Sequence, residues 1–334
     1  MIITKTPFRM SFFGGGTDIK NFFCEHGGAV ISTTFNKYCY VNVRHLPQFF
    51  DYRNRVTYSK IELTKNSDDI EHPAVREAMK MLDMHELSVA YDADLPARTG
   101  LGTSSSFAVG MIQAFYALKG KYVDKKNLAI DAIRLERDLC HEDGGWQDQI
   151  AAAYGGMNRI EFCGNGFEVH PIIIHPDRKE ALNDNLMMFF TGFSRFSAEI
   201  QTNTKNHIKD KTMQLLEMKS LVDRAEEVLE DKYSDLNEFG RLLDYTWKLK
   251  QQTGDRISTS SIDEMYQKAI DAGAIGGKLL GAGGGGFLLF YVERDKQDSV
   301  KKAMQNLLEI PFKFESTGSE IIYYSPEQYP PVEQ

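Results

Sequence analysis

The chain has 334 residues, more than one hydrophobic core usually organises, so we expect two domains of comparable size. Its net charge of −8 argues against a general nucleic-acid or anionic-membrane surface, and no run approaches the ~18 apolar residues that a membrane span needs. Four dispersed cysteines without a C-x-x-C pair argue against a zinc or dithiol site. Together with the lack of a visible signal peptide, they favour reduced thiols and a cytoplasmic location.

The first half of the chain is predicted to alternate short strands with helices. β-branched and aromatic residues predict strands at 29–34, 38–44, 87–94, 157–162 and 167–174. Apolar runs and capping residues predict helices at 105–118, 124–141 and 146–154. The pair Gly144-Gly145 separates the last two of these helices.

The composition changes between Pro176 and Asn185, where we place the boundary between a domain of residues 1–180 and a domain of residues 181–334. In the second domain we expect strands at 186–191 and 287–292 and helices within 198–252 and 261–271. Residues 326–334 have the composition of a loose tail.

The stretch from Pro96 to Gly110 is the most informative in the chain. It reads PARTGLGTSSSFAVG, in which Gly100 and Gly102 lead into four hydroxyl residues and an apolar helix. A glycine turn that opens into a helix suits phosphate, because glycine allows close backbone approach and the first helical N–H groups are free. The alternative is an ordinary Ser/Thr cap after a glycine turn.

A second glycine cluster, Gly276 to Gly286, reads GGKLLGAGGGG. It contains G-x-G-x-x-G, but a strand rather than a helix follows, so a dinucleotide-binding turn is rejected, and it does not fit a Walker A loop. Seven glycines in eleven positions predict a backbone wall packed against a phosphate or a phosphate loop. A plain glycine-rich turn is the alternative.

Phosphoryl transfer also needs positive charge, oxygen ligands for magnesium and a carboxylate near the acceptor hydroxyl. Arg9, Glu136 and Asp148 could supply these groups, Asp148 being the most suggestive because it is wedged between Gly144-Gly145-Trp146 and an alanine-rich turn. Each also has a structural alternative: a surface strand residue for Arg9, an exposed helical glutamate for Glu136 and a helix-start carboxylate for Asp148.

These segments together resemble the GHMP small-molecule kinases, which include galactokinase, homoserine kinase and mevalonate kinase. The family has three motifs in order, matched here by 7–18, by 96–104 with Thr103 in place of the first serine, and by 281–286. The resemblance implies an α+β fold of two domains, the N-terminal one ribosomal-protein-like and the C-terminal one ferredoxin-like. It also implies binding of ATP and Mg²⁺.

By this resemblance, Asp148 is the catalytic base, Arg9 is its electrostatic partner, and Ser104 and Glu136 hold Mg²⁺. Arginine cannot shuttle protons, so the role of Arg9 must be electrostatic. The implied nucleotide-binding residues are Pro96, Gly100, Leu101, Gly102, Thr103, Ser104, Ser105, Ser106, Gly281, Gly283 and Gly284.

Two segments indicate which branch of the family the chain resembles. They are GGGTD, Gly14 to Asp18, and GGWQDQ, Gly144 to Gln149. They are similar to those of sugar 1-kinases that act on heptose 7-phosphate and on fucose, which phosphorylate an anomeric hydroxyl. The residues implied for the acceptor are Gly16, Thr17, Asp18, Trp146 and Gln147.

We expect the heptose 7-phosphate branch, with a neutral-sugar kinase and a non-catalytic sugar-binding regulator as alternatives. Retention of both carboxylates, Glu136 and Asp148, favours an enzyme. A distal phosphate needs a basic subsite. Arg195 is the first candidate and Arg98 the second, with Lys278, Lys5 and Arg44 also considered. The expected partners are ATP and a sugar phosphate rather than nucleic acid or membrane, and the sequence leaves the oligomeric state open, a dimer included.

Overall fold

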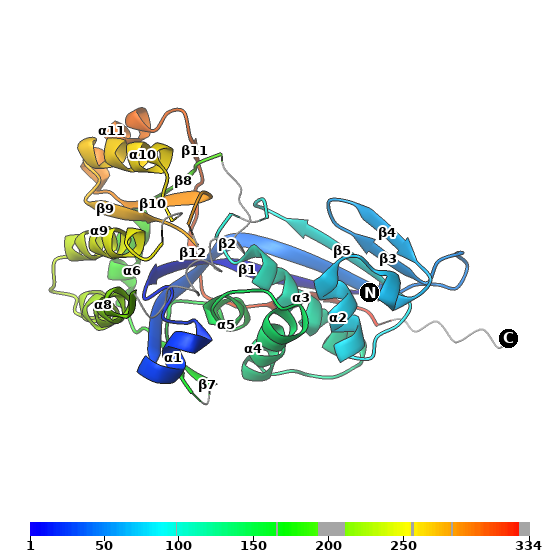
Figure 1. The fold of residues 1–334 in the computed structure, drawn as a ribbon. Helices are drawn as coiled ribbons and strands as arrows, with labels where there is room; N and C mark the ends of the chain where they lie inside the picture. Colours follow the sequence, from blue (N-terminus) through cyan, green and yellow to red (C-terminus); the bar gives the residue numbers. More distant parts are fainter. Residues whose placement is uncertain (98, 165, 193–210, 255–256, 282, 327–334) are drawn as a thin grey trace.

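The computed structural model describes residues 1–97, 99–164, 166–192, 211–254, 257–281 and 283–326. Two β-sheets with flanking helices make up the fold, a large sheet in the N-terminal part and a small sheet at the other end of the molecule (Figure 1). This arrangement confirms the predicted two-domain α+β class.

The large sheet is built on two long antiparallel strands, β1 (Ile2–Phe13) and β2 (Gly28–His45). Residues 29–34 and 38–44, predicted as two strands, are both parts of β2. The pairing with β1 jumps from Phe8↔Phe35 to Pro7↔Tyr38, so the residues between form a bulge rather than a turn.

Seven further strands complete this sheet. Its main path is β13-β1-β2-β5-β3-β4, while β12 and β6 also pair with β2, and β7 pairs with β6. These strands are β3 (Asn54–Thr57), β4 (Ile61–Thr64), β5 (Leu87–Ala93), β6 (Asn158–Cys163), β7 (Gly166–Pro171), β12 (Phe314–Glu315) and β13 (Glu320–Tyr324).

Helices cover one face of the large sheet (Figure 1). The most buried is α3 (Thr103–Leu118), whose apolar residues pack against β1 and β2. Gly110 allows that contact, because a Cβ there would lie 2.7 Å from the Thr6 hydroxyl oxygen. The other helices of this part are α1 (Lys20–His26), the 3₁₀ turn η1 (Ser67–Asp69), α2 (Pro73–Met81), α4 (Lys125–Ile133) and α5 (Gln147–Tyr154).

The helix predicted at 124–141 has a change of geometry within it. Asp124 caps α4 as expected, accepting a hydrogen bond of 2.9 Å from the Asn127 N–H. From Arg134 to Leu139 the helix continues as the π-helical segment η2. A π-helical turn is rare and has no sequence signature of its own, which is why a uniform helix was expected.

The small sheet has the order β11-β8-β10-β9 and is all antiparallel. Its strands are β8 (Leu186–Phe190), β9 (Gly276–Leu279), β10 (Phe287–Tyr291) and β11 (Leu308–Glu309). The surrounding helices are α6 (Pro176–Asp184), α8 (Thr212–Glu230), α9 (Asn237–Gln251), α10 (Ser260–Asp271), the 3₁₀ turn η4 (Arg294–Lys296) and α11 (Gln297–Ala303).

Two sequence expectations for this part are refined. The segment at 176–185, where the composition changes, is largely the helix α6 with a proline at its start. The described part of the predicted helical region 198–252 is two helices, α8 and α9, interrupted at residues 231–236. There, aspartate side chains accept local N–H groups, as at Asp231 and Tyr233.

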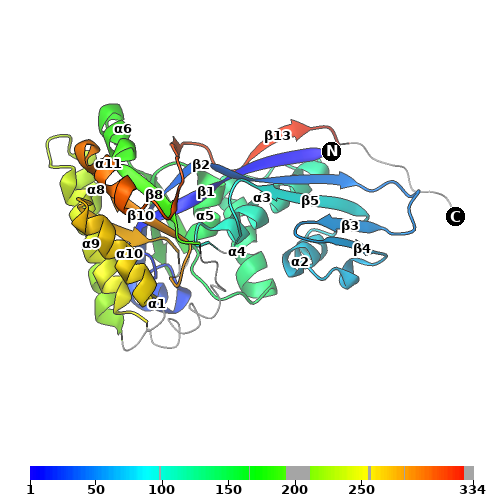
Figure 2. The same cartoon turned by 90° about the horizontal axis from the view of Figure 1, so that it is seen from above.

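After β11 the chain returns to the large sheet, where β12 pairs with β2 and β13 pairs with β1 (Figure 2). One continuous apolar core includes residues of both parts, among them Phe12 from β1 and Phe239 from α9, whose rings meet edge to face at 5.2 Å. The two parts are therefore packed directly on each other. In the described ranges, no helix is both long and apolar enough to cross a membrane.

Candidate active site

Arg9 and Asp148 form a bidentate ion pair at the junction of the two domains. The Arg9 Nε and Nη2 atoms each donate to an Asp148 carboxylate oxygen at 2.7 Å. Arg9 is only 4% exposed, whereas the Asp148 side chain keeps 22% of its surface accessible. A buried fork of two parallel hydrogen bonds fixes the carboxylate in one orientation, with its open side toward a cavity.

Arg9 also holds the predicted phosphate loop. Its Nη1 donates to the Gly100 carbonyl at 2.7 Å, and its own N–H donates to the Leu101 carbonyl at 3.2 Å. Gly100 and Gly102 have φ values of +82° and +72°, which glycine adopts at low cost. Gly102 is the residue just before α3, so the loop ends at the N-terminus of a buried helix of 16 residues.

The second glycine cluster packs on this loop, backbone against backbone. A Cβ at Gly281 would lie 2.3 Å from the Gly100 Cα, and a Cβ at Gly286 would lie 2.1 Å from the Thr99 carbonyl oxygen. No larger residue fits at either position without moving the loop. The cluster is thus a backbone wall behind the loop, as the composition predicts.

Glu136 lies behind the first turn of α3, where η2 turns it inward. Ser104 Oγ and Ser105 Oγ donate to its two carboxylate oxygens at 2.8 and 2.7 Å, and the Gln149 amide also donates to it. Glu136 is 1% exposed, so the alternative of a solvent-exposed helical glutamate is wrong.

This group of side chains fits a divalent cation. Its donors are carboxylate, hydroxyl and amide oxygens, the ligands that Mg²⁺ prefers. The Gln149 Oε1 atom is buried and has no hydrogen-bond partner, and the Glu136 carboxylate is bonded to neutral groups only among the described residues. A cation at Ser104 and Glu136 would compensate that buried charge.

A cavity of about 90 Å³ opens beside Asp148, between the turn after β1, the 144–148 loop and residues of α9. Asp18 is buried in its wall and accepts the N–H groups of Gly16 and Gln147 at 2.9 and 3.2 Å. Burial raises the pKa of the Asp18 carboxyl, and the nearby Asp148 charge raises it further. Gly145 permits this contact, because a Cβ there would lie 1.8 Å from an Asp18 oxygen.

Two polar atoms of this cavity lack partners. Ser11 Oγ and Gln147 Oε1 are buried, line the cavity and accept or donate no hydrogen bond within the described structure. Buried polar atoms are normally satisfied, so such atoms in a cavity wall indicate a polar ligand. Hydroxyl groups can both donate and accept, which matches these two atoms.

Two lysines of the C-terminal domain also line the cavity. Lys278, a predicted acceptor residue, is buried on β9 and donates to the Phe12 carbonyl at 2.7 Å. Lys250, which the sequence analysis missed, donates to the Gly281 carbonyl. Burial, with repulsion from Arg9, lowers the pKa of Lys250 to about 8, and burial lowers the pKa of Lys278 well below its usual range. Lys250 had no sequence signal beyond its place on an amphipathic helix.

Other predicted residues lie outside the cavity wall. The Thr17 hydroxyl bonds within its turn to Gly14 and Ala29, Ser106 Oγ donates to the Pro7 carbonyl, and the Leu101 side chain is buried. Gly283 and Gly284 pack on Ile257 rather than on the phosphate loop. Thr103 begins α3 and Thr99 bonds back to Pro96. Arg98 and Arg195 lie outside the described residues.

Trp146 belongs to a second, larger cavity on the other side of the 144–148 loop. Its ring packs edge-on against Phe23 at 4.8 Å, and its N–H on the backbone donates to the Asp18 carbonyl. Trp146 therefore supports the loop that carries Gln147 and Asp148.

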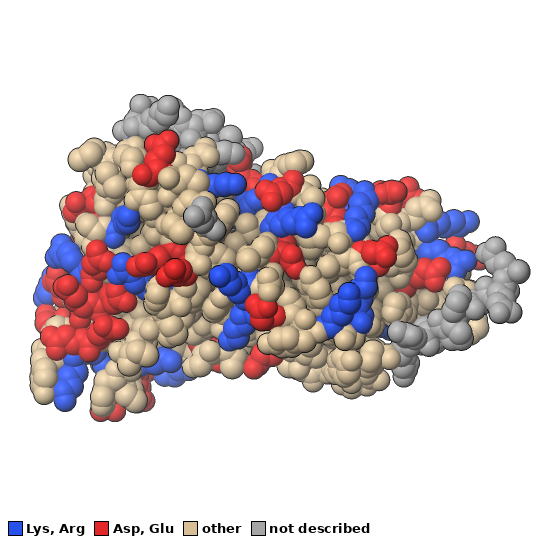
Figure 3. Space-filling view, turned by 90° about the horizontal axis from the view of Figure 1, so that it is seen from below, with Lys and Arg blue, Asp and Glu red and all other residues tan. Residues whose placement is uncertain are grey.

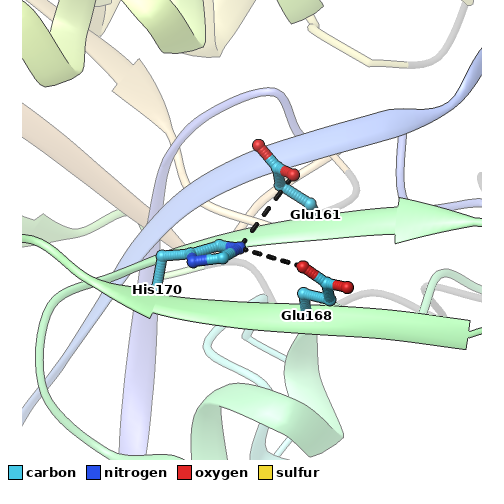
Figure 4. A group of neighbouring side chains, drawn as sticks. All are labelled: Glu161, Glu168 and His170. Atoms are coloured by element: carbon cyan, nitrogen blue, oxygen red, sulfur yellow. Dashed lines mark ion pairs between the residues drawn. The ribbon is translucent and has the colours of Figure 1, made fainter.

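Glu161, Glu168 and His170 form a separate group on the β6–β7 hairpin, with ligand atoms within 4.8 Å of one another (Figure 4). Arg159 already donates to Glu161 at 2.7 Å. These side chains are largely exposed, and they share no residue with either cavity.

Family models match both parts of the chain. The GHMP kinases N terminal domain matches residues 63–156, and the GHMP kinases C terminal domain matches residues 221–310. The D-glycero-alpha-D-manno-heptose 7-phosphate kinase of Campylobacter jejuni is 30% identical over 91% of this chain and 93% of its own length. The chain belongs to the GHMP kinase family. As a GHMP kinase it is an ATP-dependent phosphotransferase.

Further relatives show how widely this GHMP kinase fold is shared. The galactokinase of Pyrococcus furiosus is 23% identical over 91% of the chain and 92% of its own length. A crystal structure described as a D-glycero-D-manno-heptose 1-phosphate kinase from Bacteroides thetaiotaomicron superposes with a TM-score of 0.77, at 24% identity, covering 97% of this chain and 99% of that one.

Proposed function

We propose that this GHMP kinase transfers the γ-phosphoryl group of ATP to the anomeric hydroxyl of a sugar, and that the sugar is D-glycero-D-manno-heptose 7-phosphate. The observation that carries the sugar kinase proposal is the Arg9–Asp148 pair at a small polar cavity with two unpartnered buried atoms, Ser11 Oγ and Gln147 Oε1. The heptose assignment draws on the Campylobacter relative.

Asp148 is the group that faces the acceptor. Held by Arg9, its carboxylate is fixed beside the cavity and accepts the proton of the sugar hydroxyl, or orients that hydroxyl, as transfer proceeds. Arg9 stays charged throughout, because a guanidinium does not lose its proton near neutral pH. Its remaining role is to hold Asp148 and the loop carbonyl of Gly100 together, so that acceptor and donor sites keep one geometry.

The donor phosphates fit the loop from Gly100 to Ser104 at the start of α3, where the helix dipole favours negative charge. Ser104 and Glu136 would hold Mg²⁺ there, and the ion would neutralise phosphate charge. Ser11, Asp18 and Gln147 offer the sugar hydroxyls their hydrogen-bond partners on the acceptor side.

A kinase screen tests this function. Purified protein is incubated with ATP, Mg²⁺ and one of four sugars: heptose 7-phosphate, fucose, mannose or galactose, and ADP release is measured. We expect heptose 7-phosphate to be used at least about tenfold more efficiently than the others, since a charged contact contributes roughly 1.5–3 kcal/mol. A preference for fucose would move the assignment to a neutral-sugar kinase, and no turnover with any sugar would contradict the proposal.

A further inference from the structure

The larger cavity has a volume of about 680 Å³ and lies between α1 and the outer face of α4 and η2. It meets the small cavity at three residues that line both, Ile19, Arg137 and Gly144. Binding pockets for small molecules typically measure roughly 300–1,000 Å³. At about 90 Å³, the cavity beside Asp148 is smaller than this range, so part of a sugar phosphate whose anomeric end reaches Asp148 would lie outside it.

Basic side chains gather in this larger cavity. Lys20 from α1, Lys126 from α4 and Arg134 from η2 line it, and none of them forms an ion pair with a described residue. Figure 3 shows the molecule from below, with basic and acidic side chains interspersed over its middle. Asp138, Glu142 and Asp143 also line the cavity, so it is a pocket of mixed charge rather than a uniformly basic surface.

Residues of the π-helical segment η2 line both cavities. Its Glu136 is buried against Ser104, while Arg134 faces the larger cavity and Arg137 reaches both. Arg137 donates to the Gly145 carbonyl at 3.0 Å and to the Glu142 carbonyl at 3.2 Å. π-helical turns occur frequently at functional sites.

We propose that the larger cavity is the subsite for the distal phosphate of the acceptor sugar, with Lys20 and Arg134 as its counter-charges. This inference rests on the proposed function and assigns the phosphate to residues other than Arg98, Arg195 or Lys278. Because Ile19, Arg137 and Gly144 line both cavities, the two cavities are adjacent, and a sugar phosphate could place its anomeric end at Asp148 and its phosphate in the larger cavity. A phosphate with close to two negative charges supplies the anionic partner that Lys20 and Arg134 lack among the described residues.

The test compares two acceptors, the heptose with and without its 7-phosphate, in the wild type and in single variants. The measured quantity is the ratio of kcat/KM for the two sugars. Lys20→Met and Arg134→Gln should each lower this ratio by at least about fivefold, as expected for loss of one charge-assisted contact in a partly exposed site. Lys121→Met is the matched control, because Lys121 is exposed and lies in neither cavity.

A second readout is the dependence of the heptose 7-phosphate KM on ionic strength. Salt should raise the wild-type KM, and it should raise the KM of Arg134→Gln less steeply. An unchanged ratio in both variants, or a fall in Arg195→Ala alone, would overturn the subsite while leaving the proposed substrate intact. Equal efficiency of the wild type on both sugars would instead reject the heptose phosphate itself, and the subsite with it.

Discussion

The small cavity beside Asp148 and the larger cavity lined by Lys20 and Arg134 differ in how their charges are partnered. Beside the phosphate loop, Asp148 is paired with Arg9, and Glu136 receives three hydrogen bonds. Across the 144–148 loop, Lys20 and Arg134 form no ion pair with any described residue, and their cavity is several times larger. The proposed catalytic groups are therefore held in position by the fold itself, whereas the larger cavity offers cations that an anionic ligand can neutralise.

This difference follows from the elements that build each region. Arg9 sits on a long central strand and Glu136 behind a buried helix, so their neighbours are fixed by the core. Rigid surroundings suit catalysis, which depends on groups placed within fractions of an ångström of the productive geometry. Lys20 and Arg134 are exposed at the surface, where long side chains can adjust to a substrate.

The largest effect is expected when Asp148, the proposed base of the Arg9–Asp148 pair, loses its charge. Asp148→Asn keeps the size of the side chain and removes its charge, so kcat should fall by at least ~100-fold while ATP still binds. Steady-state kinetics measure the first quantity, and fluorescence titration with a nucleotide analogue measures the second. A variant that retains more than about a third of the wild-type rate would show that Asp148 is not the base.

A smaller effect is expected where the glycine wall meets the phosphate loop. Gly281→Ala places a methyl group 2.3 Å from the Gly100 Cα at a φ of +82°, so backbone must move. We expect a loss of about 2 kcal/mol in the free energy of unfolding and a raised KM for ATP. The matched control is Gly164→Ala, since a Cβ at Gly164 meets nothing within 4 Å. Equal urea midpoints for the two variants would contradict this packing argument.

The proposed metal site allows a paired test of two serines, Ser104 and Ser106. Ser104→Ala removes a hydroxyl bonded to Glu136 and should lower kcat about tenfold at low Mg²⁺, with partial recovery at high Mg²⁺. Ser106→Ala removes a hydroxyl that bonds only to the Pro7 carbonyl and should leave the Mg²⁺ dependence unchanged. Identical Mg²⁺ titrations of the two variants would remove Ser104 from the metal site.

Lys250, like Lys278, is a cation of the small cavity with no carboxylate partner among the described residues. With its pKa lowered from 10.5 to about 8, the folded state binds fewer protons than the unfolded state between these values. The wild type should therefore gain roughly 2–3 kcal/mol relative to Lys250→Met between pH 7 and pH 10. Urea unfolding at both pH values measures this gain, and parallel pH profiles would contradict it.

The sequence predicts the Arg9–Asp148 and Ser104–Glu136 groups better than it predicts the larger cavity. The phosphate loop and the glycine wall stand in short glycine-rich motifs, the resemblance to the family implies roles for Arg9, Glu136 and Asp148, and the structure brings these residues together. Lys250 and Arg134 belong to no motif. Their positions depend on how α9 and η2 pack, which is a property of the whole fold.

The sequence predicts the fold class but not the pairing of strands that lie far apart in the chain. Residues 29–34 and 38–44 are predicted as two separate strands, and only pairing with β1 shows that the residues between them form a bulge within one strand. The return of β12 and β13 to the large sheet joins segments almost a whole chain length apart, and no local pattern encodes such contacts. The intrinsic propensities of the residues predict where strands form, and tertiary packing decides which strands pair.

The position of the transferred phosphate tests the central claim most directly. The product of a reaction with ATP, Mg²⁺ and heptose 7-phosphate is examined by ³¹P NMR with coupling to the sugar protons. We predict a second phosphate coupled to the anomeric proton, and a far weaker signal of this kind from Asp148→Asn at the same reaction time. A phosphate on any other carbon, or an unmodified sugar, would contradict it.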